Sequence, residues 1–323
     1  MPRREKAVVA VKLFSATLGQ MALLLLLIAL GYLLGKLRYL PDSAAKVLSR
    51  LENAVFIPAL VLDTFISQCT PEKIASSWKL LLGSLAVEAA VIPVSLLLAR
   101  ACSRNGYLRR IYAYGLSFSN FAFMGNAVVS ALFPDIFLDY LIFTLPLWTL
   151  IYAWGVPALL MPKESGRRGF AAALRPLANP MFAAMLAGLC IGLSAVPLPA
   201  FLSSAISVCG GCMSPVAMLL TGITVSRLDL AAVLKEKSIY LVSLFRLLLF
   251  PALFALPLKL LGASGPFYAC LVCSLAMPLG LNTIVIPSAY GLDTSAASGM
   301  ALVSHLFSIV TIPVVFRLML GAG

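Results

Sequence analysis

The sequence predicts an all-α polytopic membrane protein, in which ten transmembrane helices form two inverted five-helix repeats with broken crossover helices 4 and 9. Three observations predict this fold. Of the 323 residues, 61% are hydrophobic and only 11% are charged, whereas about a quarter of the residues in a soluble domain are charged. The apolar residues form long runs separated by short charged intervals. Features of the first half of the chain also recur in the second half at a nearly constant spacing.

The predicted membrane spans follow from the length of the apolar runs, because a helix needs about 20 mostly apolar residues to cross the hydrocarbon layer. The first run continues through GYLLG to Lys36 without an A-x-A-like cleavage site, so we expect a retained helix rather than a signal peptide. The spans use nearly the whole chain and leave no room for a soluble catalytic domain. They lie at 14–36, 43–66, 77–99, 109–133, 137–161, 179–196, 200–225, 237–260, 266–290 and 295–319.

The charges predict the orientation of the chain. Its 24 basic and 12 acidic residues give a net charge of +12, which in a soluble chain would suggest nucleic-acid binding. Here the basic residues sit at the ends of apolar segments, where they meet lipid headgroups, so no nucleic-acid partner is expected. Loops after odd-numbered spans hold fifteen Lys and Arg residues, against eight on the other side. This bias predicts an integral plasma (inner) membrane protein with both termini extracytoplasmic, although four basic residues near the N-terminus argue against it.

The internal repeat has a spacing of 156 to 158 residues. Because each half holds an odd number of spans, the second half must enter the membrane from the opposite side. We therefore predict a first repeat at 1–161, a cytoplasmic linker at 162–178 and an inverted repeat at 179–323, a construction typical of secondary transporters. The recurring features are Gly31 and Gly35 at Gly188 and Gly192, Leu40-Pro41 at Leu198-Pro199, Pro58 at Pro215, Asn126 at Asn282, Asp135 at Asp293, and Pro157 at Pro313.

A substrate site is expected near the midplane, where helices break and expose backbone groups. The fourth span reads YGLSFSNFAFMGNAVVSALFP and the ninth reads SLAMPLGLNTIVIPSAYGLD. Proline removes an amide donor, glycine relaxes the backbone, and asparagine can satisfy freed backbone groups or hold a ligand. Such features at matching positions of both halves favour a site over two merely kinked helices. The candidate substrate-binding residues are Asn120, Gly125, Asn126, Pro278, Gly280, Asn282 and Thr283.

Charged residues inside the spans are candidates for coupling. Arg246 lies in the eighth span, and its repeat equivalent lies near Glu88 in the third. Two interpretations remain open for them: a structural ion pair, or separate roles in anion attraction and proton coupling. Asp63, in the second span with Glu52, is an alternative protonatable group. His305 is either a proton relay or a neutral imidazole bonded to a neighbouring helix.

The remaining sequence motifs indicate neither a metal site nor an enzyme active site. The sequences CGGC at 209–212 and CLVC at 270–273 have the spacing of metal or redox sites, but they fall in or beside apolar spans. We therefore expect no metal and no other cofactor. No Ser-His-Asp, HExxH, Walker or Rossmann pattern is present, so an enzyme is not expected. The GYLLG and GLCIG motifs are typical of helix packing, and RRGFAAALRPLANP in the linker is predicted to lie on anionic headgroups.

Four stretches together resemble the auxin efflux carrier family: NAVFIPALVLDTF, SNFAFMGN, PVAMLLTGITVS and AMPLGLNTIVIPSAYGLD. The resemblance covers essentially the full chain and is strongest in the ninth span up to Tyr290-Gly291. It implies a ten-helix carrier with outside termini, two broken helices that cross at the centre, and a homodimer. It also implies an organic-acid substrate, either an auxin-like monocarboxylate or a malonate-like dicarboxylate. The short linker is similar to that of prokaryotic permeases.

Two departures from the family pattern affect the crossover. Members usually carry Gly-x-Pro at the break of the fourth span, where this sequence has Gly125-Asn126-Ala127. Thr283 stands where plant members place a proline. The resemblance therefore implies a softer crossover than in those members.

The prediction is a secondary transporter that moves a small organic anion by alternating access, with proton coupling or uniport. One alternative is a sodium-coupled bile-acid-type symporter, which should show acidic and polar groups beside the crossover. Only Glu88 and neutral asparagines are available there. The other alternative is a channel or a non-transporting membrane sensor, but a channel lines a continuous pore with rings of polar residues. Free half-helix N-termini favour an anionic substrate.

Overall fold

The computed structural model describes residues 3–41, 43–68, 70–161, 180–194, 197–227, 235–289 and 292–321. The predicted linker 162–178 with its amphipathic stretch and the Tyr290-Gly291 pair lie outside the described residues.

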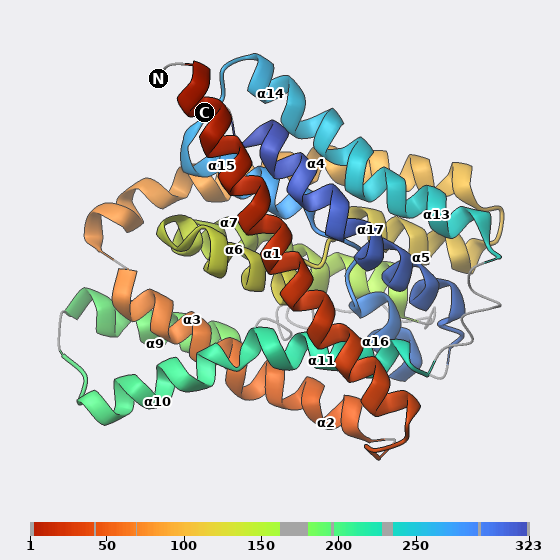
Figure 1. Cartoon of the computed structure of the whole chain (residues 1–323), viewed down its shortest axis with the longest axis horizontal. Coiled ribbons are helices and arrows are strands. Elements are labelled where there is room, and N and C mark those ends of the chain that lie inside the picture. The colour runs from red at the N-terminus through yellow and green to blue at the C-terminus, as the bar shows by residue number, and fades with distance from the viewer. Residues whose placement is uncertain are drawn as a thin grey trace.

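All regular secondary structure in these ranges is helical, which confirms the all-α prediction. Several helices contain wide or tight helical turns, labelled η. The elements are α1 (Arg3–Lys36), α2 (Ala44–Leu51), η1 (Glu52–Phe56), α3 (Ile57–Gln68), α4 (Pro71–Cys102), α5 (Gly106–Ser117), η2 (Phe121–Gly125), α6 (Asn126–Leu132), η3 (Pro134–Ile136), α7 (Phe137–Leu150), η4 (Ile151–Leu160), α9 (Pro180–Ser194), α10 (Ala200–Gly211), α11 (Met213–Val225), α13 (Lys237–Leu244), η6 (Phe245–Leu249), η7 (Pro251–Ala255), α14 (Leu256–Leu260), α15 (Gly265–Ala276), α16 (Asn282–Ala289) and α17 (Ser295–Met319) (Figure 1).

Five stretches of helix in the described part are long and apolar enough to cross a membrane: Phe14–Lys36, Ser77–Cys102, Ala200–Val225, Lys237–Leu260 and Ser295–Met319. A sixth results if Pro134–Leu150 and Ala153–Leu160, which are bent by 45°, form one span. These six agree with the predicted first, third, fifth, seventh, eighth and tenth spans. The fourth, sixth and ninth predicted spans hold the shorter apolar helices Phe121–Leu132, Pro180–Ser194 and Gly265–Ala276. The second is helical throughout 44–68 but is not among the membrane-capable stretches, so the ten-span arrangement stays a prediction.

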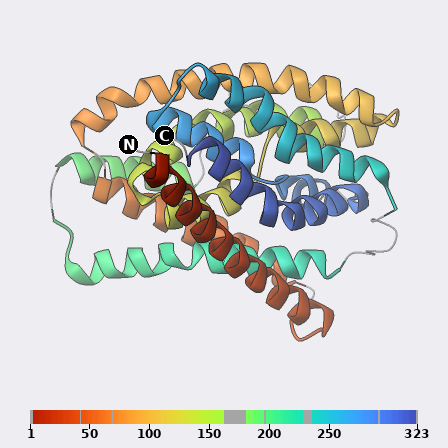
Figure 2. The same ribbon diagram turned by 45° about the horizontal axis from the view of Figure 1, so that its top comes forward.

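The helices pack in two groups. In the first group α1 packs against α11, and α3 packs against α9 and α10. In the second group α4 packs against α5 and α7, while α17 packs against α13 and α15. Figure 2 shows α10 and α11 (green) on the opposite side of the molecule from α4 (orange). Helix α1 also packs on α17 and therefore joins the two groups.

The contact between α1 and α11 depends on glycine. A Cβ atom at Gly31 would lie 2.2 Å from the Leu219 carbonyl oxygen, and one at Gly222 would lie 2.0 Å from that of Ile28. The two backbones therefore approach too closely for any side chain at these positions. The glycines of GYLLG therefore pack α1 closely against α11, as predicted.

The N- and C-termini lie at one end of the molecule (Figure 1). Basic residues gather at the other end: Lys36, Arg100, Arg109, Arg110 and Lys237. We call this end, where α1 and α4 end and α5, α13 and α17 begin, the basic end. It is tied together by a 2.6 Å hydrogen bond from the Tyr107 hydroxyl to the Asp293 carbonyl and by a 2.8 Å bond between the Tyr112 and Ser238 hydroxyls.

Candidate functional site

The first broken helix runs through α5, η2 and α6. Helix α5 ends at Ser117, and Phe118 is extended, with φ −118° and ψ 113°. Helical geometry resumes at Phe121 in the wide turn η2, which runs directly into α6. The break therefore lies at Phe118–Asn120.

The second broken helix consists of α15 and α16. Helix α15 ends at Ala276, and Met277 is extended, with φ −71° and ψ 146°. The next residue is Pro278, whose ring disfavours the helical conformation of the residue before it. Helix α16 begins at Asn282. The break predicted at this proline is thus where the helix stops.

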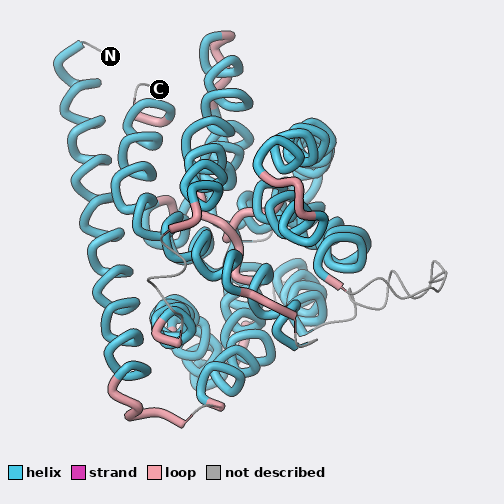
Figure 3. Tube along the Cα trace, turned by 90° about the vertical axis from the view of Figure 1, so that its right-hand side faces the viewer, coloured by secondary structure: helices cyan, strands magenta, loops and turns pink. Residues whose placement is uncertain are grey.

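The two breaks cross each other inside the molecule. The backbone amide of Asn120 donates a 2.7 Å hydrogen bond to the Pro278 carbonyl. Ser119 and Leu279 pair as an isolated antiparallel bridge. We call Phe118–Asn120 and Met277–Leu281 the crossover segments. A Cβ atom at Gly280 would lie 3.2 Å from the Ser119 carbonyl oxygen, so glycine permits the close approach. Figure 3 shows loop segments enclosed by helices at the centre of the molecule.

Arg246, on η6, caps both broken helices. Its side chain is only 2% exposed. Its guanidinium donates to the carbonyl oxygens of Leu116 at 2.9 Å, Ser274 at 3.1 Å and Met277 at 3.4 Å. Carbonyls in the last turn of a helix lack intrahelical donors and carry partial negative charge, so a buried cation stabilises them. The two half-helix C-termini thus share one positive charge.

Glu88, on α4, lies within electrostatic reach of Arg246 but does not bond to it. The side chain is 4% exposed, and its Oε2 atom is enclosed without a hydrogen-bond partner among the described residues. All three hydrogen bonds of the Arg246 side chain go to carbonyl oxygens instead. The structure therefore shows no hydrogen bond between Glu88 and Arg246 in the described part of the chain, and the role of Glu88 in coupling stays a prediction.

Helix α17 supports the crossover segments from one side. The Asn120 side-chain amide lies 3.0 Å from His305 Nε2, and the Ser304 hydroxyl accepts a 3.2 Å hydrogen bond from the Leu279 amide. His305 Nδ1 lies 2.7 Å from the Ala301 carbonyl oxygen, which can only accept. Nδ1 therefore carries a proton that it donates within α17, while Nε2 faces the side chain of Asn120 in the crossover.

The predicted break at Gly125-Asn126-Ala127 is wrong by several residues. Gly125 lies in η2, and Asn126 is the first residue of α6, within continuous helical structure. The helix breaks earlier because the backbone amide of Asn120 donates its hydrogen bond to the carbonyl of Pro278 on the other broken helix. Gly125 instead leaves room for a side chain, since a Cβ atom there would lie 2.2 Å from the hydroxyl of Tyr140.

The remaining predicted binding residues follow the two breaks: Asn282 begins α16, whereas Asn126 lies five residues after the start of its half-helix at Phe121. Asn126 is 3% exposed, and its Oδ1 atom has no hydrogen-bond partner among the described residues. Asn282 is half-buried, and its side-chain amide donates a 3.1 Å hydrogen bond to the Tyr114 hydroxyl. The Thr283 hydroxyl donates to the Gly280 carbonyl at 2.8 Å. Thr283 therefore stabilises the turn that a proline would otherwise shape.

Asp63 lies away from the crossover. It is on α3, in the first helix group, and its side chain interacts with Ser207 of α10. Glu52, in η1, is fully buried with both carboxyl oxygens unpartnered among the described residues. The structure thus brings Glu88 and Arg246 to the crossover but leaves the two acids of the second predicted span in the other group.

Sequence reasoning missed three residues of this site, two through their side chains and one through its backbone carbonyl. Tyr114 contacts Asn282 and Tyr140 donates a 3.1 Å hydrogen bond to the Phe121 carbonyl, but tyrosines in apolar spans carry no pattern that marks them. Ser274 was missed too, although its carbonyl accepts hydrogen bonds from both Arg246 and the Ser119 hydroxyl. Only the repeat could have found it, since Ser274 lies 158 residues after Leu116, the other carbonyl that Arg246 contacts.

These features define an integral membrane protein whose two broken helices cross at a buried, polar centre. A family model described as membrane transport protein matches residues 16–172 and 167–316, which is nearly the whole chain. The chain belongs to this family, the family of the auxin efflux carriers, and is accordingly a membrane transport protein. None of the curated proteins matches it. Membership of a transporter family agrees with the expectation that the chain is not an enzyme.

Proposed function

We propose that the protein is a secondary transporter that moves a small organic anion, an auxin-like monocarboxylate or a malonate-like dicarboxylate, by alternating access. The substrate would bind beside the crossover segments, between the starts of the two second half-helices. The observation that carries this proposal is the pairing of Asn120 with Pro278 at a buried break in each helix. Broken helices at membrane depth are tolerated where they line a cavity or a binding site.

Three pairs of residues, each separated by 158 positions, support the proposed inverted repeat. Asn120 and Pro278, which bond to each other, are separated by 158 residues. The same spacing separates Leu116 from Ser274, whose carbonyls both bond to Arg246, and it separates Glu88 from Arg246 itself. Two halves related by a two-fold axis through the crossover would place equivalent residues together in this way. This supports a first repeat at 1–161 and a second at 179–323.

An anionic substrate fits the polarity of the half-helices. Arg246 satisfies the negative C-terminal ends of α5 and α15, whereas the half-helices that follow the crossover segments begin with positive N-terminal ends. Asn282 is the first residue of α16, and Asn126 lies within the half-helix that starts at Phe121. An asparagine side chain can present its amide nitrogen to a carboxylate after rotation by 180°. Neutral donors bind an anion without the strong attraction that would prevent its release.

Glu88 is the proposed coupling group. Its enclosed oxygen without a partner suits a carboxyl group that takes up a proton in one state and releases it in another. Glu88 and Arg246 are both buried inside the molecule, and Arg246 bonds to the ends of both broken helices. Asp63 is the alternative, in the other helix group. Proton coupling is therefore expected to depend on Glu88.

Alternating access would move the second helix group, which holds both broken helices, against the first. The proposal includes ten spans, both termini outside the inner membrane, and a cytoplasmic basic end. The bias of Lys and Arg toward that end supports the orientation. By family resemblance the protein would form a homodimer.

The test of this function is substrate-dependent charge movement in proteoliposomes. Indole-3-acetate and malonate are offered with and without a pH gradient, and in a separate arm with a sodium gradient. A current that responds to one of the acids and to the pH gradient supports the proposal. A current that requires sodium would favour the bile-acid-type alternative, and no response to any acid would overturn the organic-anion assignment.

Two variants separate coupling from transport. Glu88→Gln keeps the shape of the side chain but cannot ionise, so it should retain substrate exchange and lose the response to the pH gradient. Asp63→Asn is the matched change in the other helix group. Loss of the pH response in Asp63→Asn, with Glu88→Gln unaffected, would move the coupling role to Asp63.

A further inference from the structure

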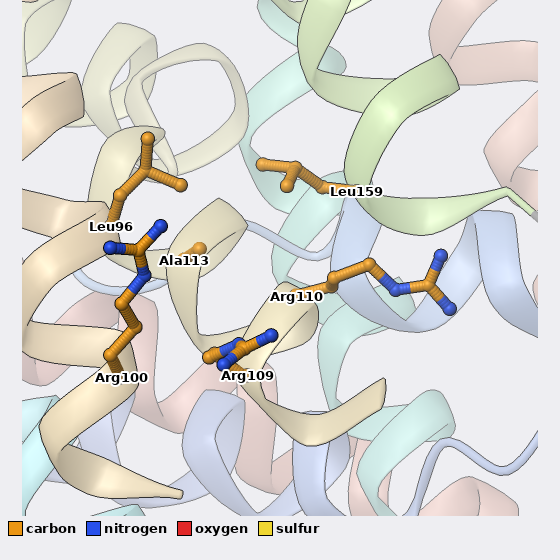
Figure 4. Close-up of a pocket in the computed structure, with 6 residues that line it drawn as sticks. All are labelled: Leu96, Arg100, Arg109, Arg110, Ala113 and Leu159. Carbon is orange, nitrogen blue, oxygen red and sulfur yellow. The ribbon is translucent and has the colours of Figure 1, made fainter. Parts of the chain in front are cut away.

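A hollow at the basic end is lined by three arginines and no acid. It has a volume of about 180 Å³ and is bounded by Leu96, Arg100, Arg109, Arg110, Ala113 and Leu159. Arg100 comes from the last turn of α4, Arg109 and Arg110 from the first turns of α5, and Leu159 from η4. In Figure 4 Leu96 lies above Arg100 and Leu159 lies above Arg110, with Ala113 and Arg109 between them and the Arg110 side chain extending away from the other two arginines. Cationic side chains and an apolar wall thus face the same space.

The charge in this hollow is not balanced by its lining. Arg110 is only half-buried as a residue, yet its Nη1 atom is enclosed and has no hydrogen-bond partner in the described part of the chain. Arg100 and Arg109 are exposed. An enclosed guanidinium nitrogen without an acceptor is costly, since burying a polar group costs free energy unless it is hydrogen-bonded. An anion in the hollow would supply that acceptor.

We propose that Arg100, Arg109 and Arg110 bind the phosphate group of an anionic phospholipid. Guanidinium groups bind phosphate oxygens through paired hydrogen bonds, which favours this chemistry over a point charge. A hollow of about 180 Å³ has room for a phosphodiester headgroup with part of its glycerol, and acyl chains would lie outside it. Basic pockets between transmembrane helices are known to hold such headgroups. The apolar wall suits the glycerol end, and exposed Leu97 on α4 suits the acyl chains beyond it.

The position of the hollow supports a lipid over a free anion. The basic end is where apolar helices give way to charged residues, the depth at which headgroups lie. Arg100 follows the long apolar stretch of α4, whose membrane-capable part ends at Cys102. The site is separate from the crossover segments and does not depend on the proposed substrate.

Native mass spectrometry of the full-length protein tests this site, with dioctanoyl-phosphatidylglycerol as the probe. Each arginine near an anionic headgroup should change affinity by about fivefold, so the variant with Arg100→Gln, Arg109→Gln and Arg110→Gln should bind about a hundredfold more weakly. Arg109→Gln alone, at an exposed side chain, should fold normally and bind about fivefold more weakly. The matched control carries Lys46→Gln, Arg104→Gln and Lys235→Gln, three exposed charges that line no part of the hollow.

Each outcome is decisive. Retained binding in the control and lost binding in the arginine variants support the site. Equal weakening in both triple variants would show general surface attraction and overturn the proposal, as would unchanged affinity in Arg109→Gln and in the arginine triple variant. Inorganic phosphate and dioctanoyl-phosphatidylcholine are the comparison ligands. Saturable phosphate binding as tight as that of phosphatidylglycerol would make this a free-anion site and overturn the lipid assignment.

Discussion

Replacing Arg246 by methionine tests whether one buried cation holds the crossover together. The change removes three hydrogen bonds to carbonyl oxygens. The Ser274 carbonyl keeps the Ser119 hydroxyl as donor at 2.9 Å, so two carbonyls, those of Leu116 and Met277, lose their donor. An unsatisfied buried acceptor costs about 1–3 kcal/mol. Removing the buried charge recovers part of the cost of the two unsatisfied carbonyls, so the free energy of unfolding should fall by about 3 kcal/mol. At about 2 °C per kcal/mol for a large chain, Tm should fall by about 6 °C.

The assay is thermal unfolding of purified full-length protein in detergent, read by tryptophan fluorescence. Arg246→Lys should give an intermediate loss, because a compact ammonium group cannot span both half-helix C-termini as the planar guanidinium does. Arg104→Met, at an exposed arginine of the basic end, should leave Tm unchanged. A Tm of Arg246→Met within about 1 °C of the wild-type value would refute the capping role.

Three further predictions follow from contacts and charge. Gly280→Val should abolish transport and lower Tm, because even a Cβ atom would sit 3.2 Å from the Ser119 carbonyl oxygen in the crossover; full transport activity would contradict this. Gly31→Ala should lower the free energy of unfolding by about 1–3 kcal/mol through overpacking, because its Cβ atom would lie 2.2 Å from a backbone carbonyl oxygen of α11. Gly19→Ala on the same helix is the control. Its Cβ atom would meet nothing within 4 Å, so it should raise the free energy of unfolding by up to about 1 kcal/mol. Hydrogen bonds from the hydroxyl and the backbone amide of the serine two residues later lower the pKa of Asp293. The contribution of Asp293 to stability should therefore be fully present above the unfolded pKa of about 4 and be lost as pH falls through the lower pKa of the folded state. An Asp293→Asn variant that is as sensitive to acid as the wild type would contradict this assignment.

The fold class and the second break could be predicted from the sequence because they depend on local chemistry. Long apolar runs predict membrane helices wherever they occur, and Pro278 lacks an amide hydrogen and restricts Met277, so it interrupts a helix whatever surrounds it. Gly31 shows the same for packing. Its place in a GxxxG motif was enough to predict close helix contact, which the approach to α11 bears out.

The first break could not be placed from the sequence, since no proline or glycine lies at Phe118–Asn120. That break exists because the Asn120 amide bonds to Pro278, a contact between residues far apart in the chain. The break was predicted at Gly125 instead. In the structure, the absence of a side chain at Gly125 leaves space for the Tyr140 hydroxyl. The role of Arg246 was hidden for a related reason. Its partners are backbone carbonyls, which every residue carries, so only the folded structure reveals which of them it caps.

The most direct test of the proposed transport site is the substrate-dependent current of Asn126→Ala and Asn282→Ala proteoliposomes, with Asn53→Ala as control. Asn53 is exposed, and among the described residues its side chain bonds to the Ser49 carbonyl one turn earlier. A site beside the crossover predicts that both Asn126→Ala and Asn282→Ala lose the current while Asn53→Ala and protein stability are unaffected. Wild-type currents in both crossover variants, with the protein folded and active on its substrate, would contradict a site between the two half-helices.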